Sequence, residues 1–355
     1  MKARILLLML CLTQGATVQP AWSDASAKTT SGPRYRKLHF SYSFVIKDIP
    51  ANSQVLRVWV PVPRSDEHQT VRILQTKAPV TTRLTVDPEY GNRILYAEIL
   101  HPQSEAEFEL EYEVTRREFS RGDYVVLERR DSAPGQVPAS MDRLVAPDKL
   151  IPIDGKIKSL AQEITGNESG TVAKAKAAYD YLFTTMRYDK SGSGWGRGDA
   201  IWACDAKRGN CTDFHSPFIG MMRADDIPAR FDIGFPLPAD KTEGEIPGYH
   251  CWAEFYSSRI GWIPIDISEA WKAKEKRDYF FGSIDANRIM FSTGRDITLN
   301  PKQAGPPLNY FIYPYVELDG KQYDTSAKHF SFQEVNTTAP KAKAFPPQSG
   351  SNSGG

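Results

Sequence analysis

The stretch Arg208-Gly209-Asn210-Cys211-Thr212-Asp213-Phe214 places a cysteine after two turn-forming residues and before a mainly apolar run at 218–222. This pattern predicts a helix that begins at or near Cys211. Free backbone N–H groups and the positive end of the helix dipole stabilise a thiolate there, and the same groups can hold an oxyanion. Pro217 removes one helical hydrogen bond. The helix therefore either kinks at Pro217, or its regular part begins at Ser216-Pro217.

Two further stretches, 248–256 and 261–266, read as the strands of a hairpin and carry His250 and Asp266. If the hairpin folds about Ser258, Glu254 lies opposite Trp262 and His250 lies opposite Asp266. Directly opposed residues have Cβ atoms about 5 Å apart, so this register brings a carboxylate to the imidazole ring. A carboxylate there fixes the tautomer and leaves the other ring nitrogen for a thiol. A slip of one residue would break the pairing.

Residues 208–266 resemble the transglutaminase-like core found in many bacterial exported proteins. The matching motifs are Arg208-Gly209-Asn210-Cys211-Thr212-Asp213, Asp226-Ile227-Pro228-Ala229-Arg230, His250-Cys251-Trp252-Ala253-Glu254 and Gly261-Trp262-Ile263-Pro264-Ile265-Asp266. The resemblance implies an α+β fold with a papain-like core, in which Cys211 is the nucleophile, His250 the base and Asp266 the acid that orients the base. Ser216-Pro217 and Cys251 depart from the family pattern.

The resemblance also implies amide chemistry through an acyl-thioester, ending in hydrolysis or in transfer to an amine. The expected substrate is a glutamine side chain or a peptide bond, in a protein or peptide, and the chemistry requires no cofactor and no metal ion. Trp195 and Trp202 are candidates for the second oxyanion donor, although a packing role fits each of them as well. The alternative function is a catalytically silent binding module of the cell envelope that uses the same groove.

The rest of the chain predicts a second domain before this core. Alternating apolar residues at 38–46, 56–62 and 108–114 predict strands with one buried face. Apolar residues at steps of three and four over 172–186 predict a helix. The predicted organisation is a signal peptide (1–23), a small antiparallel β-sandwich (34–118), a connection (119–150), the transglutaminase-like catalytic domain (151–334) and a disordered tail (335–355).

The first residues predict export to the periplasm or secretion. Lys2 and Arg4 precede a short apolar run, and Ala21-Trp22-Ser23 offers small residues for cleavage. No run is long enough to span a membrane. Loss of Lys2 and Arg4 from 44 basic side chains, against 43 acidic ones, leaves a formal net charge of −1. That balance gives no reason to expect nucleic acid as a partner.

Cleavage would leave three cysteines, Cys204, Cys211 and Cys251, of which at least one must be unpaired. A bridge from Cys204 to Cys251 would free Cys211, whereas a bridge from Cys204 to Cys211 would block it. These cysteines, His215 and His250 are also possible zinc ligands, but the paired Cys-x-x-Cys spacing of structural zinc is absent. His215 is a rival base for which no simple register supplies a carboxylate.

Overall fold

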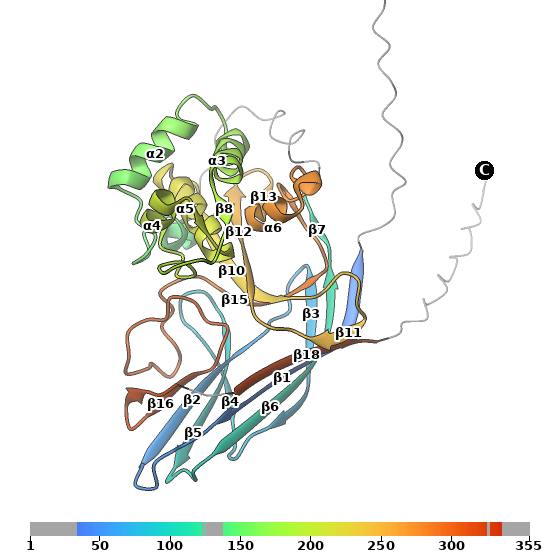
Figure 1. Cartoon of the computed structure of the whole chain (residues 1–355), viewed down its shortest axis with the longest axis vertical. Helices are drawn as coiled ribbons and strands as arrows, with labels where there is room; N and C mark the ends of the chain where they lie inside the picture. Colours follow the sequence, from blue (N-terminus) through green and yellow to red (C-terminus); the bar gives the residue numbers. More distant parts are fainter. Residues whose placement is uncertain (1–33, 123, 125–137, 325–326, 336–355) are drawn as a thin grey trace, which may run out of the picture. The chain divides into compact units, whose positions relative to one another are not determined.

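The computed structural model describes residues 34–122, 124, 138–324 and 327–335 (Figure 1). The predicted signal peptide, residues 125–137 of the predicted connection, and the predicted tail after residue 335 lie outside this part. In the part that is described, no helix is long and apolar enough to cross a membrane.

Two five-stranded antiparallel sheets bury a common apolar core. One has the order β11-β18-β1-β6-β3 and the other the order β17-β16-β2-β5-β4. Their bounds are β1 Tyr35–Ile46, β2 Val55–Val62, β3 Gln69–Lys77, β4 Arg83–Val86, β5 Arg93–Leu100, β6 Ala106–Arg117, β11 Glu243–Glu245, β16 Tyr315–Leu318, β17 Lys321–Gln322 and β18 Ala327–Glu334.

The predicted alternation in the first strand is confirmed. Leu38, Phe40, Tyr42, Phe44 and Ile46 of β1 are all buried and share one core cluster with apolar residues of β2 and β5. Because side chains alternate between the faces of a strand, this set turns inward while the residues between them are more exposed.

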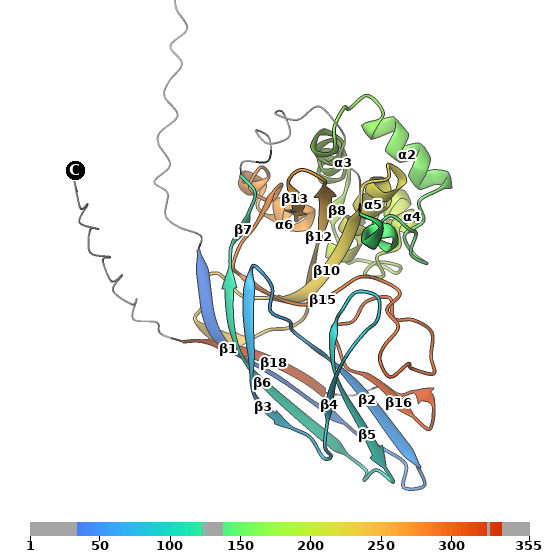
Figure 2. The ribbon, with the colours of Figure 1, turned by 180° about the vertical axis from the view of Figure 1, so that it is seen from behind.

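The two sheets also take strands from well beyond residue 118. Strand β18 pairs with β1, and β16 pairs with β2, so these two late strands extend both sheets (Figures 1 and 2). Strand β11 adds a short edge next to β18. The two sheets of the sandwich therefore include strands that we predicted to belong to the catalytic domain. The domain boundaries remain predictions.

The second part of the fold is a four-stranded antiparallel sheet with helices packed on it. The sheet order is β13-β12-β10-β15, and α5 packs against β10 and β12 (Figure 1). The bounds are α2 Gly155–Thr165, α3 Thr171–Thr185, α4 Ala200–Ala206, α5 Cys211–Ala224, β10 Ala229–Pro236, β12 His250–Ser257, β13 Gly261–Ile265, α6 Ile267–Lys272 and β15 Arg288–Thr293. Short elements complete it: β7 Phe119–Ser120, η1 Ala139–Leu144, β8 Arg187–Tyr188, β9 Arg208–Gly209, η2 Lys274–Lys276 and β14 Ser283–Ile284.

This mixed architecture confirms the predicted α+β class. The helix predicted over 172–186 is α3, in which Val172, Ala175, Tyr179 and Leu182 are buried. The strand predicted over 261–266 ends one residue earlier, at Ile265, because Asp266 caps a helix.

Helix α5 begins at Cys211 and continues through Pro217. A regular start at Ser216-Pro217 is therefore excluded. Every residue from Cys211 to Arg223 is buried, so tertiary packing stabilises the helix across the position where proline supplies no N–H. The Ser216 hydroxyl donates to the carbonyl of Thr212, at 2.8 Å.

Candidate active site

Cys211 is the first residue of α5, and side chains cap the helix start around it. The Asn210 side chain accepts the Thr212 N–H at 2.9 Å, and the Asp213 carboxylate accepts the Asn210 N–H at 2.9 Å. These two bonds form a capping box. Asp213 also accepts the N–H of Gly196 at 2.7 Å, which ties the glycine-rich loop to the helix start. The predicted position of Cys211 is confirmed.

His250 is the first residue of β12, and Asp266 directly follows β13 as the N-cap of α6. Nε2 of His250 donates to Oδ2 of Asp266 at 2.7 Å, and both side chains are buried. The side chains of Cys211 and His250 also interact: His250 lowers the pKa of Cys211, and Cys211 raises that of His250. Since Nε2 is engaged by Asp266, Nδ1 is the ring nitrogen left for the thiol. The three residues singled out from the sequence thus form a continuous chain of thiol, imidazole and carboxylate.

The hairpin reaches this contact in a register different from the predicted one. Glu254 lies opposite Pro264, not opposite Trp262, so the hairpin folds one residue later than expected. Asp266 is consequently two residues out of direct opposition to His250. A shift of two residues leaves every side chain on its original face, whereas a shift of one would have reversed the faces. The predicted partnership therefore survives an incorrect register.

The Asp266 carboxylate is saturated with donors. Oδ2 accepts Nε2 of His250 at 2.7 Å and Nη1 of Arg288 at 2.8 Å, while Oδ1 accepts the Ser268 hydroxyl and the Glu269 N–H, each at 3.0 Å. Asp266 has no exposed surface. Four donors and two adjacent positive charges hold this carboxyl in its ionised form despite its burial. Sequence reasoning missed Arg288.

The electrostatics of the chain favour a charged pair. Burial would raise the pKa of the Cys211 thiol, but interactions with the Cys251 and His250 side chains and the charge of His250 hold it well below its ordinary value. Burial would likewise lower the pKa of His250, yet the Asp266 charge raises it to about 10. The pKa of Asp266 lies well below its usual range, since His250 and Arg288 outweigh the effect of burial. Thiolate and imidazolium are therefore the stable forms near neutral pH.

His215, to which no simple register assigned a carboxylate, lies on the other side of the same carboxylate. Its Nε2 is 3.6 Å from Oδ1 of Asp266 and accepts the backbone N–H of Ile267 at 3.1 Å. Its Nδ1 lies 3.9 Å from Sγ of Cys251. Burial lowers the pKa of His215 to about 4. A neutral ring that accepts a backbone N–H supports the start of α6 and is poorly suited to be the base.

All three described cysteines are unpaired. Cys204 lies on α4, where burial raises the pKa of its thiol to about 11 and Lys156 is its main charged neighbour. Neither predicted bridge from Cys204 is present. Cys251 instead contacts His215, and the neighbouring Cys211 side chain adds to burial in raising the pKa of Cys251. Across the described ranges, no three His, Cys, Asp or Glu side chains are arranged to hold a metal ion.

The two tryptophans considered as oxyanion donors make other contacts. Nε1 of Trp195 donates to the carbonyl of Gly192 at 3.1 Å. The Trp202 ring lies against Gly194, which has a positive φ of 91°, and under the guanidinium of Arg208. A side chain at residue 194 would collide with the Trp202 indole. The packing role is therefore the better description of both rings.

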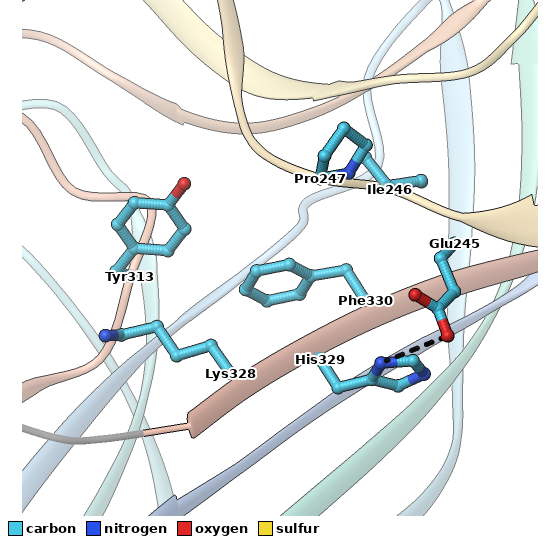
Figure 3. Close-up of a pocket in the computed structure, with 7 residues that line it drawn as sticks. All are labelled: Glu245, Ile246, Pro247, Tyr313, Lys328, His329 and Phe330. Carbon is cyan, nitrogen blue, oxygen red and sulfur yellow. Dashed lines mark ion pairs between the residues drawn. The ribbon is translucent and has the colours of Figure 1, made fainter.

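A cavity of about 430 Å³ lies beside the segment that leads into His250 (Figure 3). It is lined by Glu245, Ile246, Pro247, Tyr313, Lys328, His329 and Phe330. Phe330 and Ile246 are buried, whereas His329 and Glu245 form an exposed ion pair at 3.9 Å. Apolar side chains thus line part of the cavity, and charged side chains lie at its rim.

Tyrosines connect this cavity to the cysteine. The rings of Tyr313 and Tyr249 lie edge to face, with centroids 6.0 Å apart. The Tyr249 hydroxyl accepts Nδ2 of Asn210, the residue before Cys211, at 3.2 Å. The cavity and the thiol are therefore separated by two aromatic side chains and the helix cap.

Comparison with known proteins agrees with this geometry. Residues 158–267 match the model of the transglutaminase-like superfamily. A Haemophilus influenzae protein, named only as uncharacterized, is 27% identical over 338 residues, covering 81% of this chain and 88% of its own.

A similar fold is found in the crystal structure of a "putative cysteine protease" from Cytophaga hutchinsonii, with a TM-score of 0.57. The similarity covers 87% of this chain and 93% of that one, at 15% sequence identity. At this identity the likeness concerns the fold alone. It extends over both the sandwich and the helical part.

Proposed function

Starting from the transglutaminase-like core at residues 158–267, we propose that this protein is a cysteine enzyme that cleaves or transfers amide bonds through an acyl-thioester. The observation that carries the proposal is the buried chain from Cys211 through His250 to Asp266. It combines a thiol of lowered pKa, a base oriented by a carboxylate, and a nucleophile at a helix N-terminus.

In the proposed reaction, the Cys211 thiolate attacks a carboxamide or peptide carbonyl. The carbon–nitrogen bond breaks, and the His250 imidazolium gives its proton to the leaving amine. Neutral His250 then takes a proton from water or from an acceptor amine, which attacks the thioester and releases the thiol. Asp266 stays ionised throughout and holds the ring in one orientation. We propose the backbone N–H of Cys211, the first residue of α5, as one donor to the oxyanion.

We propose a protein or peptide as the substrate. The cavity beside Tyr249 supports this because it has apolar walls and a charged rim, as expected of a subsite for one side chain of an extended chain. Exchanging the rim charge with Lys328→Glu should raise KM several-fold and leave kcat unchanged. An unchanged KM for every peptide tested would remove this cavity from the substrate site.

The proposal is tested by incubating the full chain with dimethylated casein and a fluorescent primary amine. Covalent incorporation of the amine indicates transfer, and new peptide termini or released ammonia indicate hydrolysis. Mass spectrometry of the acid-quenched mixture should find an acyl group on Cys211. Cys204→Ala is the matched control and should behave as the native chain does, whereas Cys211→Ala should give no product.

A binding module that uses the same groove is the second candidate. Its distinguishing outcome is that Cys211→Ala fully supports the protein's role in cells.

We also propose that the protein lies outside the cytoplasm, because residues 1–23 have the pattern of a signal peptide. Cell fractionation with N-terminal sequencing should find a mature chain that begins at Asp24 in the periplasm or the medium.

A further inference from the structure

Arg288 bonds the same oxygen of Asp266 that accepts the hydrogen bond of His250. Its Nη1 lies 2.8 Å from Oδ2, and Nε2 of His250 lies 2.7 Å from that atom. We propose that Arg288 is a positioning residue, which shares the Asp266 carboxylate with His250 and limits how tightly that carboxylate holds the protonated imidazole. The inference rests on the proposed function of the chain from Cys211 to Asp266.

The surroundings of Arg288 fix its guanidinium at this position. Its side chain is 3% exposed, its Cζ lies 4.9 Å from the centre of the Trp252 ring, and its Nη2 lies 3.5 Å from Oδ1 of Asp285. A cation over an aromatic face is attracted by the ring. Arg288 is the first residue of β15 and lies outside the hairpin that carries His250. It therefore acts on Asp266 from a different strand.

Sharing one oxygen has a defined electrostatic consequence. A carboxylate that accepts two donors at one oxygen holds each of them less strongly than it would hold one. The guanidinium charge also opposes the charge of the nearby imidazolium, and in a buried site this opposition is strong. Without Arg288, the imidazolium would be held more tightly and would give its proton less readily to a leaving amine.

Other charged and titratable groups also face the pair of His250 and Asp266. They are Cys211 and His215 from α5, Cys251 from β12, Tyr179 from α3, Glu269 from α6 with its partner Lys272, and Arg288 with Asp285. Glu269 lies 3.9 Å from Nε2 of His250 but is bonded by Lys272 at 2.7 Å. Arg288 differs from this pair because it bonds the Asp266 carboxylate directly.

The test is nuclear magnetic resonance of the full chain with selectively ¹⁵N-labelled histidine. The chain has six histidines, and the signals of His250 are assigned by their loss in His250→Gln. In Arg288→Met, His250 should keep its proton to a pH higher by about half a unit or more. The proton between His250 and Asp266 should also resonate further downfield. Arg288→Gln keeps a hydrogen-bond donor without the charge, and it should change the titration of His250 and this chemical shift in the same directions. In Arg288→Lys both quantities should stay close to their native values.

Arg223→Met is the matched control. Arg223 is a buried arginine on α5 that pairs with Asp148 at 2.6 Å, away from the site. Its loss should lower the unfolding temperature and leave the His250 signals unchanged. If His250 titrates in Arg288→Met and Arg288→Gln as it does in Arg223→Met, Arg288 has only a structural role and the inference is wrong. These signals do not depend on turnover, so a failure of the proposed activity is seen separately.

Discussion

The two sides of the Asp266 carboxylate hold two buried histidines in opposite states. On the Oδ2 side, His250 donates to the carboxylate at 2.7 Å and its pKa rises to about 10. On the Oδ1 side, His215 lies 3.6 Å away, accepts a backbone N–H and has a pKa lowered to about 4. Both rings are buried, so the direction of hydrogen bonding separates them. A ring that donates to a carboxylate is held protonated, and a ring that accepts from the backbone is held neutral.

The largest expected contrast is catalytic. His250→Gln should reduce turnover by roughly 10³-fold or more, because general base catalysis and thiolate stabilisation are both lost. His215→Gln should reduce turnover by less than about tenfold, since glutamine can still accept the Ile267 N–H. Initial rates of the two folded variants on one amide substrate measure the contrast. Equal losses in both would mean that the two sides of Asp266 are not functionally distinct.

Removing the charge that the two histidines share should have the next largest effect. Asp266→Asn should lower turnover by about 10²–10⁴-fold, because the amide neither stabilises the imidazolium nor fixes its tautomer. The pKa of His250 should fall, while His215 should stay neutral. Titration of ¹⁵N-labelled histidine reports both rings at once. A His250 that titrates unchanged in this variant would show that Asp266 is not the source of its raised pKa.

The buried neutral His215 should make the folded protein less stable in acid. The pKa of His215 falls from 6.5 in the unfolded chain to about 4 in the folded protein. The unfolded chain therefore binds this proton first on acidification. The stability gained from the neutral ring is complete above about pH 6.5 and is lost as pH falls toward 4, an effect on the order of 3 kcal/mol.

Urea unfolding of His215→Gln between pH 7 and pH 4 checks this prediction. The variant should show a shallower loss of stability than the native chain over that range. His68 also has a pKa lowered to about 4, so His68→Gln is the comparison variant. It should independently reduce the loss of stability between pH 7 and pH 4. A His215→Gln curve that runs parallel to the native one would contradict the assignment.

The smallest effect is expected at the thiol next to His215. Cys251→Ala removes a buried sulfur that contacts His215. Stability should fall by about 1 kcal/mol, and turnover should change by no more than a few-fold. Thermal unfolding and initial rates measure the two. Loss of turnover as large as that of His250→Gln would make Cys251 a member of the catalytic chain.

Sequence patterns predicted the parts of the site that local rules control. The start of α5 followed from turn formers before an apolar run, and the contact of His250 with Asp266 followed from the alternation of faces in a hairpin. The exact register did not follow, because a short loop allows the fold point to move by one residue. This uncertainty did not affect the predicted contact, because moving the fold point by one residue shifts the pairing by two and keeps each side chain on the same face of the sheet.

Contacts made through tertiary structure were beyond such rules. Arg288 reaches Asp266 from β15, which pairs with β10 through an irregular register at Ile233 and Gly234. His215 reaches Asp266 because α5 lies across the sheet. Strands β16 and β18 return to the N-terminal sheets after more than 150 residues of intervening chain. No spacing within the sequence specifies these meetings.

The central claim is that Cys211 is a thiolate paired with the His250 imidazolium. The most direct measurement is the rate of Cys211 alkylation by iodoacetamide from pH 4 to pH 10, in the native chain and in His250→Gln. Burial raises the pKa of Cys204 to about 11 and that of Cys251 well above its ordinary value, so Cys211 should be labelled selectively. The account predicts a native thiol that titrates well below its reference pKa of about 8.5 and moves upward in His250→Gln. A native titration near 8.5 that is unchanged in His250→Gln would contradict it.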